Sequence, residues 1–244
     1  MHYDELLRLA KSRRTIRVLR PDPVPMEDLE KALEVARWAP SGFNMQPAEF
    51  LVLTDPEKRA AVKRIIDDWI EDDFYVLEAT REAWQGPAWT LEDRGRVACP
   101  AAPVYILIVG DTRRKAGLPM NARFCRQKGE SIFETSLADA FAYLWLGLES
   151  VGLGAQPVSA VKNDRPQALI KQYLGLPEFI YPYEMLAVGY SGLEEGPPAK
   201  LMRHLDEIVH VDGSGEGMFL SDDEVRKQIR KLRMGNVARH APSE

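Results

Sequence analysis

The stretch at 131–150 has the longest regular hydrophobic period in this sequence, with apolar side chains recurring at steps of three and four residues. This period predicts an α-helix. Its apolar side chains cover most of the helix circumference, and a helix of that kind has to be buried. We therefore expect it to lie within the core and to be covered in part by a second copy of the chain. The residues that carry the period are Ile132, Phe133, Leu137, Phe141, Leu144, Leu148 and Val151.

Helical periods and short apolar runs alternate along the rest of the chain. The periods predict helices over 2–11, 26–38, 56–70, 164–174 and 221–234, the last opened by the capping box Ser221-Asp222-Asp223-Glu224. The apolar runs predict strands at 50–53, 104–109 and 185–190, with a further short strand at 208–211. Residues 112–130 are basic and predict a loop. Helices interleaved with a few strands indicate an α+β or α/β domain.

Composition excludes several classes of protein. With 45% hydrophobic residues among 244, the chain can bury a core and is not globally disordered. Lys and Arg number 32 and Asp and Glu 37, and the net charge of −5 argues against nucleic acids and anionic membranes as partners. The longest apolar run is too short to cross a bilayer, and no signal peptide is visible, so we expect a cytoplasmic protein. Neither the two cysteines, Cys99 and Cys125, nor the four histidines have metal-ligand spacing, so no metal is expected.

A basic segment, Ser12-Arg13-Arg14-Thr15-Ile16-Arg17, follows the first predicted helix. Three guanidinium groups and a hydroxyl within six residues can bind a phosphate, because arginine presents a planar fork of donors. The alternative is a solvated basic turn, which is common on protein surfaces.

Two further segments offer polar groups or a flexible backbone. Pro40-Ser41-Gly42-Phe43-Asn44-Met45-Gln46-Pro47 carries amides that suit the mixed donors and acceptors of a heterocycle, although it can also be an ordinary turn. Gly152-Leu153-Gly154 follows a helix and lacks a third glycine, which excludes a dinucleotide fingerprint. It leaves a backbone that can closely approach a flat ligand. Lys200 and Arg203 are a second cationic contact or simple surface charge.

Taken in this order, these motifs resemble the nitroreductase-like flavin oxidoreductase family over roughly residues 5–212. The resemblance implies an α+β sandwich with a central, mostly antiparallel sheet flanked by helices. It also implies a domain-exchanged homodimer with FMN between the subunits. The implied domains are residues 1–212, with a lid or insertion at 71–100, and a C-terminal extension at 213–244 that carries a helix.

The resemblance also implies roles for individual residues. Arg13, Arg14, Thr15 and Arg17 would hold the phosphate, ribityl chain and pyrimidine edge of FMN. Pro40, Ser41, Gly42 and Asn44 would complete the pocket from the other subunit. Gly154, Ala155, Gln156 and Pro157 would pass over the ring near its N5, and Arg203 would reach the phosphate.

The aromatic-rich segment at 71–100 resembles the lid of the iodotyrosine deiodinase branch of this family. Glu71 and Tyr75 are four residues apart and share a helix face, and Arg96 follows at the spacing of the third lid residue. These three would bind the substrate. Two features depart from that branch: Arg96 replaces a lysine, and Gln156 stands where a hydroxyl residue is usual. The missing hydroxyl favours two-electron chemistry.

The function implied is an FMN-dependent oxidoreductase that passes electrons from NAD(P)H to a small aromatic acceptor in a ping-pong mechanism. The acceptor would be a nitroaromatic, a quinone or a halogenated phenol. One alternative is reductive dehalogenation of a halotyrosine-like substrate. Another is a non-catalytic protein that binds or consumes flavin.

Overall fold

The computed structural model describes residues 2–79, 98–194, 200–212 and 219–237, with side chains excepted at 74–79 and 233–237. The chain forms two compact units, one of residues 1–73 and 91–197 and one of residues 74–90 and 198–244. The first unit contains a four-stranded sheet in the order β1 (Ala48–Leu53), β2 (Val104–Asp111), β4 (Ile180–Gly189) and β3 (Gly154–Pro157). Every pair of neighbouring strands is antiparallel, which confirms the predicted α+β fold.

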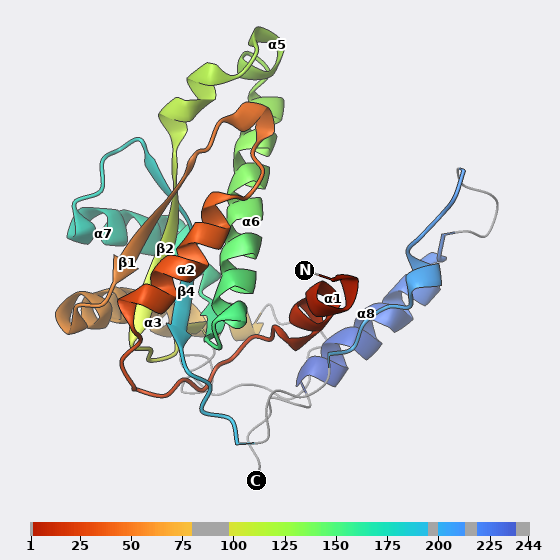
Figure 1. Ribbon diagram of the computed structural model, residues 1–244, viewed down its shortest axis with the longest axis horizontal. Coiled ribbons are helices and arrows are strands. Elements are labelled where there is room, and N and C mark those ends of the chain that lie inside the picture. Colours follow the sequence, from red (N-terminus) through yellow and green to blue (C-terminus); the bar gives the residue numbers. More distant parts are fainter. Residues whose placement is uncertain (1, 80–97, 195–199, 213–218, 238–244) are drawn as a thin grey trace. The chain divides into compact units, whose positions relative to one another are not determined.

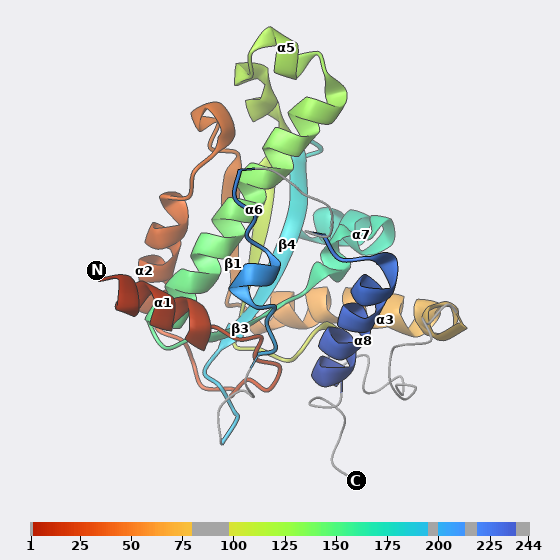
Figure 2. The same ribbon diagram turned by 90° about the vertical axis from the view of Figure 1, so that its right-hand side faces the viewer.

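Helices cover both faces of this sheet (Figures 1 and 2). On one face, α3 (Pro56–Ala79) and α7 (Asp164–Leu174) pack against one core cluster, and on the other, α2 (Met26–Arg37) and α6 (Arg126–Ser150) pack against a second. Each face of the sheet is therefore buried, as an apolar layer requires. Among the described residues, no helix is both long and apolar enough to span a membrane.

Strand β2 shows why the sheet is central. All eight of its residues are buried. Successive side chains of a strand point to opposite faces, so Tyr105, Leu107 and Val109 reach the α3 and α7 layer. Val104, Ile106 and Ile108 reach the α2 and α6 layer. An uninterrupted apolar run is typical of a strand covered on both faces.

Helix α6 confirms the prediction at 131–150 and begins earlier, at Arg126. The predicted loop at 112–130 is wrong, because it contains η2 (Thr112–Gly117), α5 (Met120–Arg123) and the first turn of α6. Two of its apolar side chains, Leu118 and Ala122, are buried against Phe133 of α6 in a third core cluster. Burial of these apolar side chains stabilises the short helices of this segment. In the sequence, the many charged residues around them obscured this signal.

Three other predictions of secondary structure need correction. Strand β4 begins at Ile180, before the predicted start at 185. Helix α3 runs on to Ala79, beyond the predicted end at 70. Residues 208–211 form no strand: a short turn, η4 (Leu205–Glu207), precedes them and no described strand pairs with them. An apolar run forms a strand only where a neighbouring strand can satisfy its backbone.

The second unit contains helix α8 (Asp222–Val237) in addition to η4. The Ser221 backbone N–H and hydroxyl both donate to Oε2 of Glu224, at 2.8 and 2.7 Å. This contact confirms the predicted helix start. The rings of His210 and Phe219 lie 4.6 Å apart, centroid to centroid, in the same unit.

Candidate functional site

The basic segment and strand β3, far apart in the sequence, lie side by side in the fold. The Ile16 N–H donates to the carbonyl of Ala155 at 3.0 Å, and Thr15 and Ala155 form a parallel β-bridge. The approach is close: a Cβ added at Gly154 would lie 2.9 Å from Cγ1 of Ile16. Glycine at 154 therefore leaves room for the Ile16 side chain beside β3. The structure brings together two of the three segments that the sequence singled out.

The guanidinium groups of this segment are partly buried, so it is not a fully solvated turn. Arg13 ends α1 (Tyr3–Ser12), and its guanidinium lies 4.0 Å from the ring centroid of Trp145 on α6. Burial lowers the pKa of Arg13, and the neighbouring Arg14 lowers that pKa further. Burial also lowers the pKa of Arg17. A bound anion would compensate these poorly solvated cations.

The Arg14 side chain bends back over the end of α1. Its Nη1 donates to the carbonyl of Lys11 and, at 3.1 Å, to that of Arg13. On the β3 side, Ala155 and Gln156 are buried and Pro157 is half-buried. The amide of Gln156 does not titrate, so the described part of this strand supplies hydrogen-bonding groups and no proton donor.

The loop at 40–47 has an unusual backbone. Phe43, Asn44 and Gln46 all have positive φ, at 55°, 53° and 45°. Non-glycine residues rarely adopt this region, and clusters of such residues are typical of functional sites. The loop is held from within, because the Gln46 N–H donates to Oγ of Ser41 at 3.0 Å and its Nε2 donates to Oδ1 of Asn44 at 2.8 Å.

This loop and the basic segment contact α6 at different positions along the helix. The Gly42 N–H donates to Oγ of Ser136 at 3.1 Å, whereas Arg13 stacks on Trp145. Nine residues of α-helix span about 14 Å, so one protomer anchors the two sets of predicted flavin contacts well apart. Asn44 and Pro40 are exposed. They are therefore available to another molecule.

The structure describes only some of the predicted lid residues. Glu71 and Tyr75 both lie in α3, and Glu71 is exposed. Arg96 and the side chain of Tyr75 lie outside the described residues. Asp72, next to Glu71, pairs with Arg165 of α7. This ion pair connects α3 to the neighbouring helix.

Arg203 belongs to the second unit and is bound within it. Its Nη2 donates to the backbone carbonyl of Glu207 at 2.6 Å, and its Nε lies 3.6 Å from Oε2 of the Glu207 side chain. Its predicted role at the phosphate stays a prediction. Among the described residues, no group of three His, Cys, Asp or Glu side chains could hold a metal ion.

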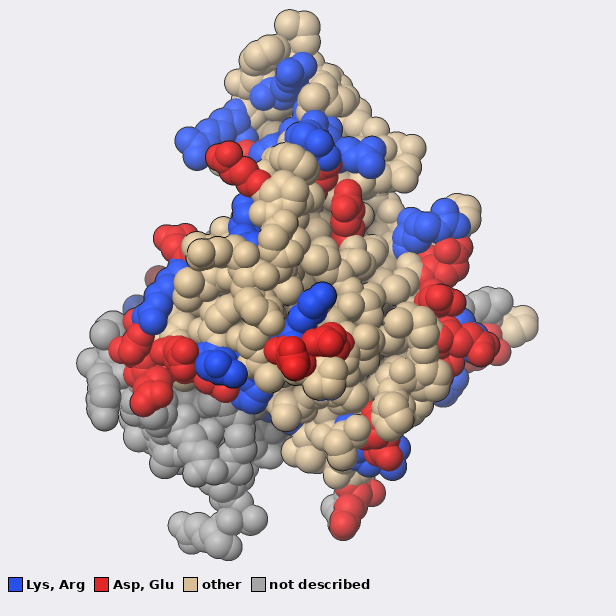
Figure 3. Space-filling view, turned by 90° about the vertical axis from the view of Figure 1, so that its left-hand side faces the viewer, with Lys and Arg blue, Asp and Glu red and all other residues tan. Residues whose placement is uncertain are grey.

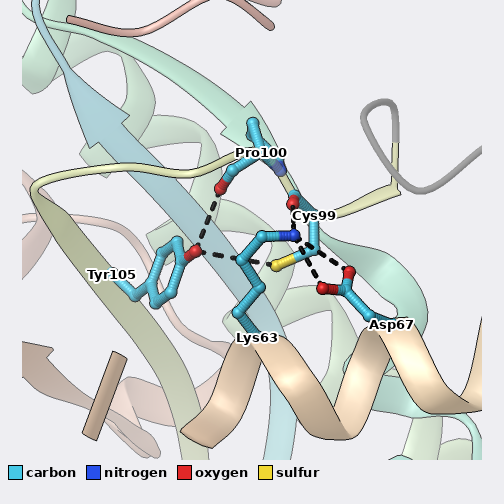
Figure 4. Close-up of polar contacts among 5 residues, drawn as sticks. All are labelled: Lys63, Asp67, Cys99, Pro100 and Tyr105. Atoms are coloured by element: carbon cyan, nitrogen blue, oxygen red, sulfur yellow. Dashed lines mark hydrogen bonds and ion pairs between the residues drawn. The ribbon is translucent and has the colours of Figure 1, made fainter. Parts of the chain in front are cut away.

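A partly buried polar cluster at the start of β2 was not anticipated from the sequence (Figure 4). Lys63 Nζ donates to both oxygens of Asp67 and, at 2.9 Å, to the carbonyl of Cys99. The Tyr105 hydroxyl donates to the carbonyl of Pro100 at 2.9 Å. Burial raises the pKa of the Cys99 thiol to about 12. A thiol in that state is a poor nucleophile. The hydrogen bond from Lys63 to the Cys99 carbonyl connects this segment to α3.

A buried carboxyl group lies on β4. Glu184 is 7% exposed, and its Oε2 lies 3.4 Å from Nζ of Lys162. Lys162 Nζ also lies 4.2 Å from the ring centroid of Tyr183. Burial raises the pKa of Glu184. The charged form of this carboxyl is therefore disfavoured by its surroundings.

The chain is similar to proteins of one family. The model of the nitroreductase family matches residues 10–190. Rat iodotyrosine deiodinase 1 is 27% identical over 210 residues, which cover 86% of this chain and 70% of that protein. The FMN reductase [NAD(P)H] of Bacillus subtilis is 22% identical over 249 residues, covering 97% and 88%. A crystal structure of iodotyrosine deiodinase bound to FMN and 3-iodo-L-tyrosine superposes with a TM-score of 0.62 at 24% identity, covering 86% of this chain and all of that one.

Proposed function

The chain belongs to the nitroreductase family, and from this premise we propose that it is an FMN-dependent oxidoreductase. We further propose that NAD(P)H reduces the flavin and that a small aromatic acceptor then takes the electrons in a ping-pong cycle. The FMN reductase of Bacillus subtilis, whose name includes both FMN and NAD(P)H, supports this assignment. The structural observation that carries it is the Thr15–Ala155 bridge.

The residues at this bridge fit FMN chemically. Its phosphate is an anion, and the partly desolvated guanidiniums of Arg13 and Arg17 favour an anion beside them. The isoalloxazine ring of FMN is flat, and a protein backbone has to approach one of its faces closely. We assign this role to the β3 backbone at the Thr15–Ala155 bridge, and Gly154 itself is buried against the Ile16 side chain.

The second half of the pocket is proposed to come from another copy of the chain. In one protomer, the loop at 40–47 is anchored near Ser136 and the basic segment near Trp145. A homodimer would place the loop of one copy against the basic segment of the other. Large apolar side chains near the loop support such an interface, since Trp38 is 70% exposed and Phe43 is 62% exposed.

When bound, FMN supplies the electron transfer. The chain would supply position and electrostatics: Arg13, Arg14 and Arg17 would hold the phosphate end, and the β3 backbone would lie against the ring. Gln156 cannot donate a proton by ionising, so water can supply the proton that the acceptor needs. The loop at 40–47 of the other copy, with its positive-φ residues, would complete the pocket on the side of the acceptor.

Reductive dehalogenation of a halotyrosine-like substrate is the second candidate. Two observations favour it: the identity to rat iodotyrosine deiodinase 1, and the uninterrupted helix that carries Glu71 and Tyr75 on one face. A carboxylate on this face would bind the ammonium group of an amino acid.

Two measurements test these proposals. The purified protein should be yellow and dimeric, and it should oxidise NADH or NADPH continuously when a quinone is added. Sustained turnover would exclude a non-catalytic flavin carrier. A colourless monomer that does not bind added FMN would contradict the proposed function. Release of iodide from 3-iodotyrosine under reducing conditions would favour the second candidate over a nitroaromatic or quinone acceptor.

A further inference from the structure

One surface segment of this acidic chain is rich in positive charge, contains no acidic residue and is not used by the proposed flavin contacts. We call residues 112–128 the basic cap; they include η2, α5 and the first turn of α6. The cap holds Arg113, Arg114, Lys115, Arg123, Arg126 and Lys128, with no Asp or Glu, in a chain of net charge −5. Figure 3 shows Lys and Arg side chains gathered at the end of the molecule where α5 lies in Figure 1.

Only part of this charge is neutralised within the fold. Arg113 pairs with Asp111 at 2.6 Å, and Lys115 pairs with Glu130 at 2.7 Å. The other four are exposed, and none of them forms an ion pair with any residue that the structure describes. These four are Arg114, Arg123, Arg126 and Lys128. The surface therefore carries positive charge that is available to a soluble anion.

The positive charges at the start of α6 do not stabilise that helix. Arg126 and Lys128 lie in the first turn of α6, which contains no acidic residue. The N-terminal end of a helix carries partial positive charge, so cations there are unfavourable and Asp or Glu is preferred. A role in binding accounts for these residues better than a role in folding.

An exposed aromatic side chain accompanies the cations. Phe124 is 74% exposed, and the guanidinium of Arg123 lies 5.7 Å from its ring centroid. Met120, also 74% exposed, precedes it by one helical turn. A planar heterocyclic base can stack on such a ring while phosphates bind nearby guanidiniums. Together, the ring and the cations suit a nucleotide better than inorganic phosphate.

The basic cap also lies beside the loop that we assign to the flavin pocket. Met45 of this loop packs with Leu118 and Ala122 of the cap in one buried cluster. The same loop donates from Gly42 N–H to Ser136 of α6, two to three turns from the start of that helix. A molecule that reaches the flavin past this loop would have its outer part over the cap.

We propose that the basic cap binds the adenosine phosphate half of the dinucleotide reductant. This inference rests on the proposed function, because a dinucleotide must place its nicotinamide at the flavin and leave its adenosine phosphates outside. In this arrangement, Arg123, Arg126 and Lys128 bind phosphate oxygens, and Phe124 supports the adenine. An acidic chain otherwise repels such a polyanion, so the cap supplies the local attraction that binding needs.

The test compares two double variants of the FMN-loaded protein. In each variant, one Arg and one Lys of the same helix are replaced by Gln. Arg126→Gln/Lys128→Gln alters the cap, and Lys58→Gln/Arg64→Gln alters two exposed cations on α3. The dissociation constant of 2′,5′-ADP is measured by calorimetry, and KM for NADPH is measured by steady-state kinetics. The cap variant should weaken 2′,5′-ADP binding and raise KM by about tenfold, while the α3 variant should match wild type.

Each other outcome is also decisive. Equal affinity for 2′,5′-ADP in wild type and the cap variant overturns the proposal, whatever the turnover. Cap-dependent binding of 2′,5′-ADP by a protein that oxidises neither NADH nor NADPH supports the adenosine phosphate site and contradicts the proposed function instead. If the cap variant changes the sedimentation of the protein, the cap contacts a second copy and the proposal is wrong.

Discussion

The guanidinium of Arg13 lies 4.0 Å from the ring centroid of Trp145, so the end of α1 is fixed on α6 beside β3. This contact orients a cation that burial has partly removed from water. Its position depends on the packing of three elements that are distant in sequence.

Replacing Arg13 with Ala should therefore weaken FMN binding. The expected loss is about 1.5–3 kcal/mol, the contribution of a hydrogen bond to a charged group. Titration of the flavin-free protein with FMN, followed by flavin fluorescence, gives the affinity. Arg8→Ala, an exposed change on the same helix, is the control and should bind FMN as wild type does. Full flavin occupancy of Arg13→Ala at sub-micromolar protein would show that Arg13 does not hold the phosphate.

Gly154→Ala should destabilise the fold, because the new Cβ would lie 2.9 Å from Cγ1 of Ile16. Overpacking of this kind costs about 1–3 kcal/mol. Urea unfolding measures the loss, and FMN content should fall with it, since the same two backbones form the proposed site. Gly117→Ala is the matched control, because no heavy atom lies within 4 Å of its added Cβ. Equal stability of the two variants would argue against the close approach.

Glu71→Gln tests the dehalogenation proposal. Loss of the carboxylate should raise KM for 3-iodotyrosine by about tenfold or more, since a charged hydrogen bond is removed. FMN content and turnover of a quinone should stay as in wild type. Asp68→Asn, exposed one turn earlier on α3, serves as the control. Unchanged KM for 3-iodotyrosine would place Glu71 on an ordinary helix face.

Glu184 should make stability depend on pH. Its pKa is raised in the folded protein by burial, so the folded state holds its proton to higher pH than the unfolded state. Stability then decreases as pH rises from the ordinary Glu pKa of about 4.3 through the raised value. Glu184→Gln should be more stable than wild type at pH 7, by about 1 kcal/mol, and lose this advantage below pH of about 4.

The control for this comparison is Glu178→Gln, which alters an exposed carboxyl. It should change the unfolding free energy by less than about 0.5 kcal/mol at either pH. A Glu184→Gln protein that is less stable at pH 7 would show that the ion pair with Lys162 outweighs the burial of the charge.

The two cysteines should differ sharply in reactivity. Cys125 is exposed and Cys99 is buried with its pKa raised to about 12. Because the thiolate is the reactive form, a maleimide at pH 8 should label Cys125 and leave Cys99 unlabelled until urea unfolds the chain. Mass spectrometry of peptides reports each site separately. Equal labelling of both cysteines in the folded protein would mean that the Lys63–Tyr105 cluster opens readily.

Local patterns in the sequence were sufficient for much of the secondary structure. The period at 131–150 depends only on neighbouring turns of one helix, and the capping box at Ser221 and Glu224 depends on contacts three residues apart. The chemical character of the basic segment is likewise a property of its residue types. These features could be predicted because each is encoded within a few turns of chain.

Tertiary packing decided the rest. The sequence predicted a flexible backbone at Gly154, and the fold makes it a strand because β4 and Ile16 supply its hydrogen bonds. The apolar run at 208–211 had no described strand to pair with and remained irregular. The basic cap forms helical turns in which Leu118 and Ala122 are buried in a core cluster together with Met45. Helix periods are local, whereas strands, bridges and sites need partners from elsewhere in the chain, and only the folded structure selects those partners.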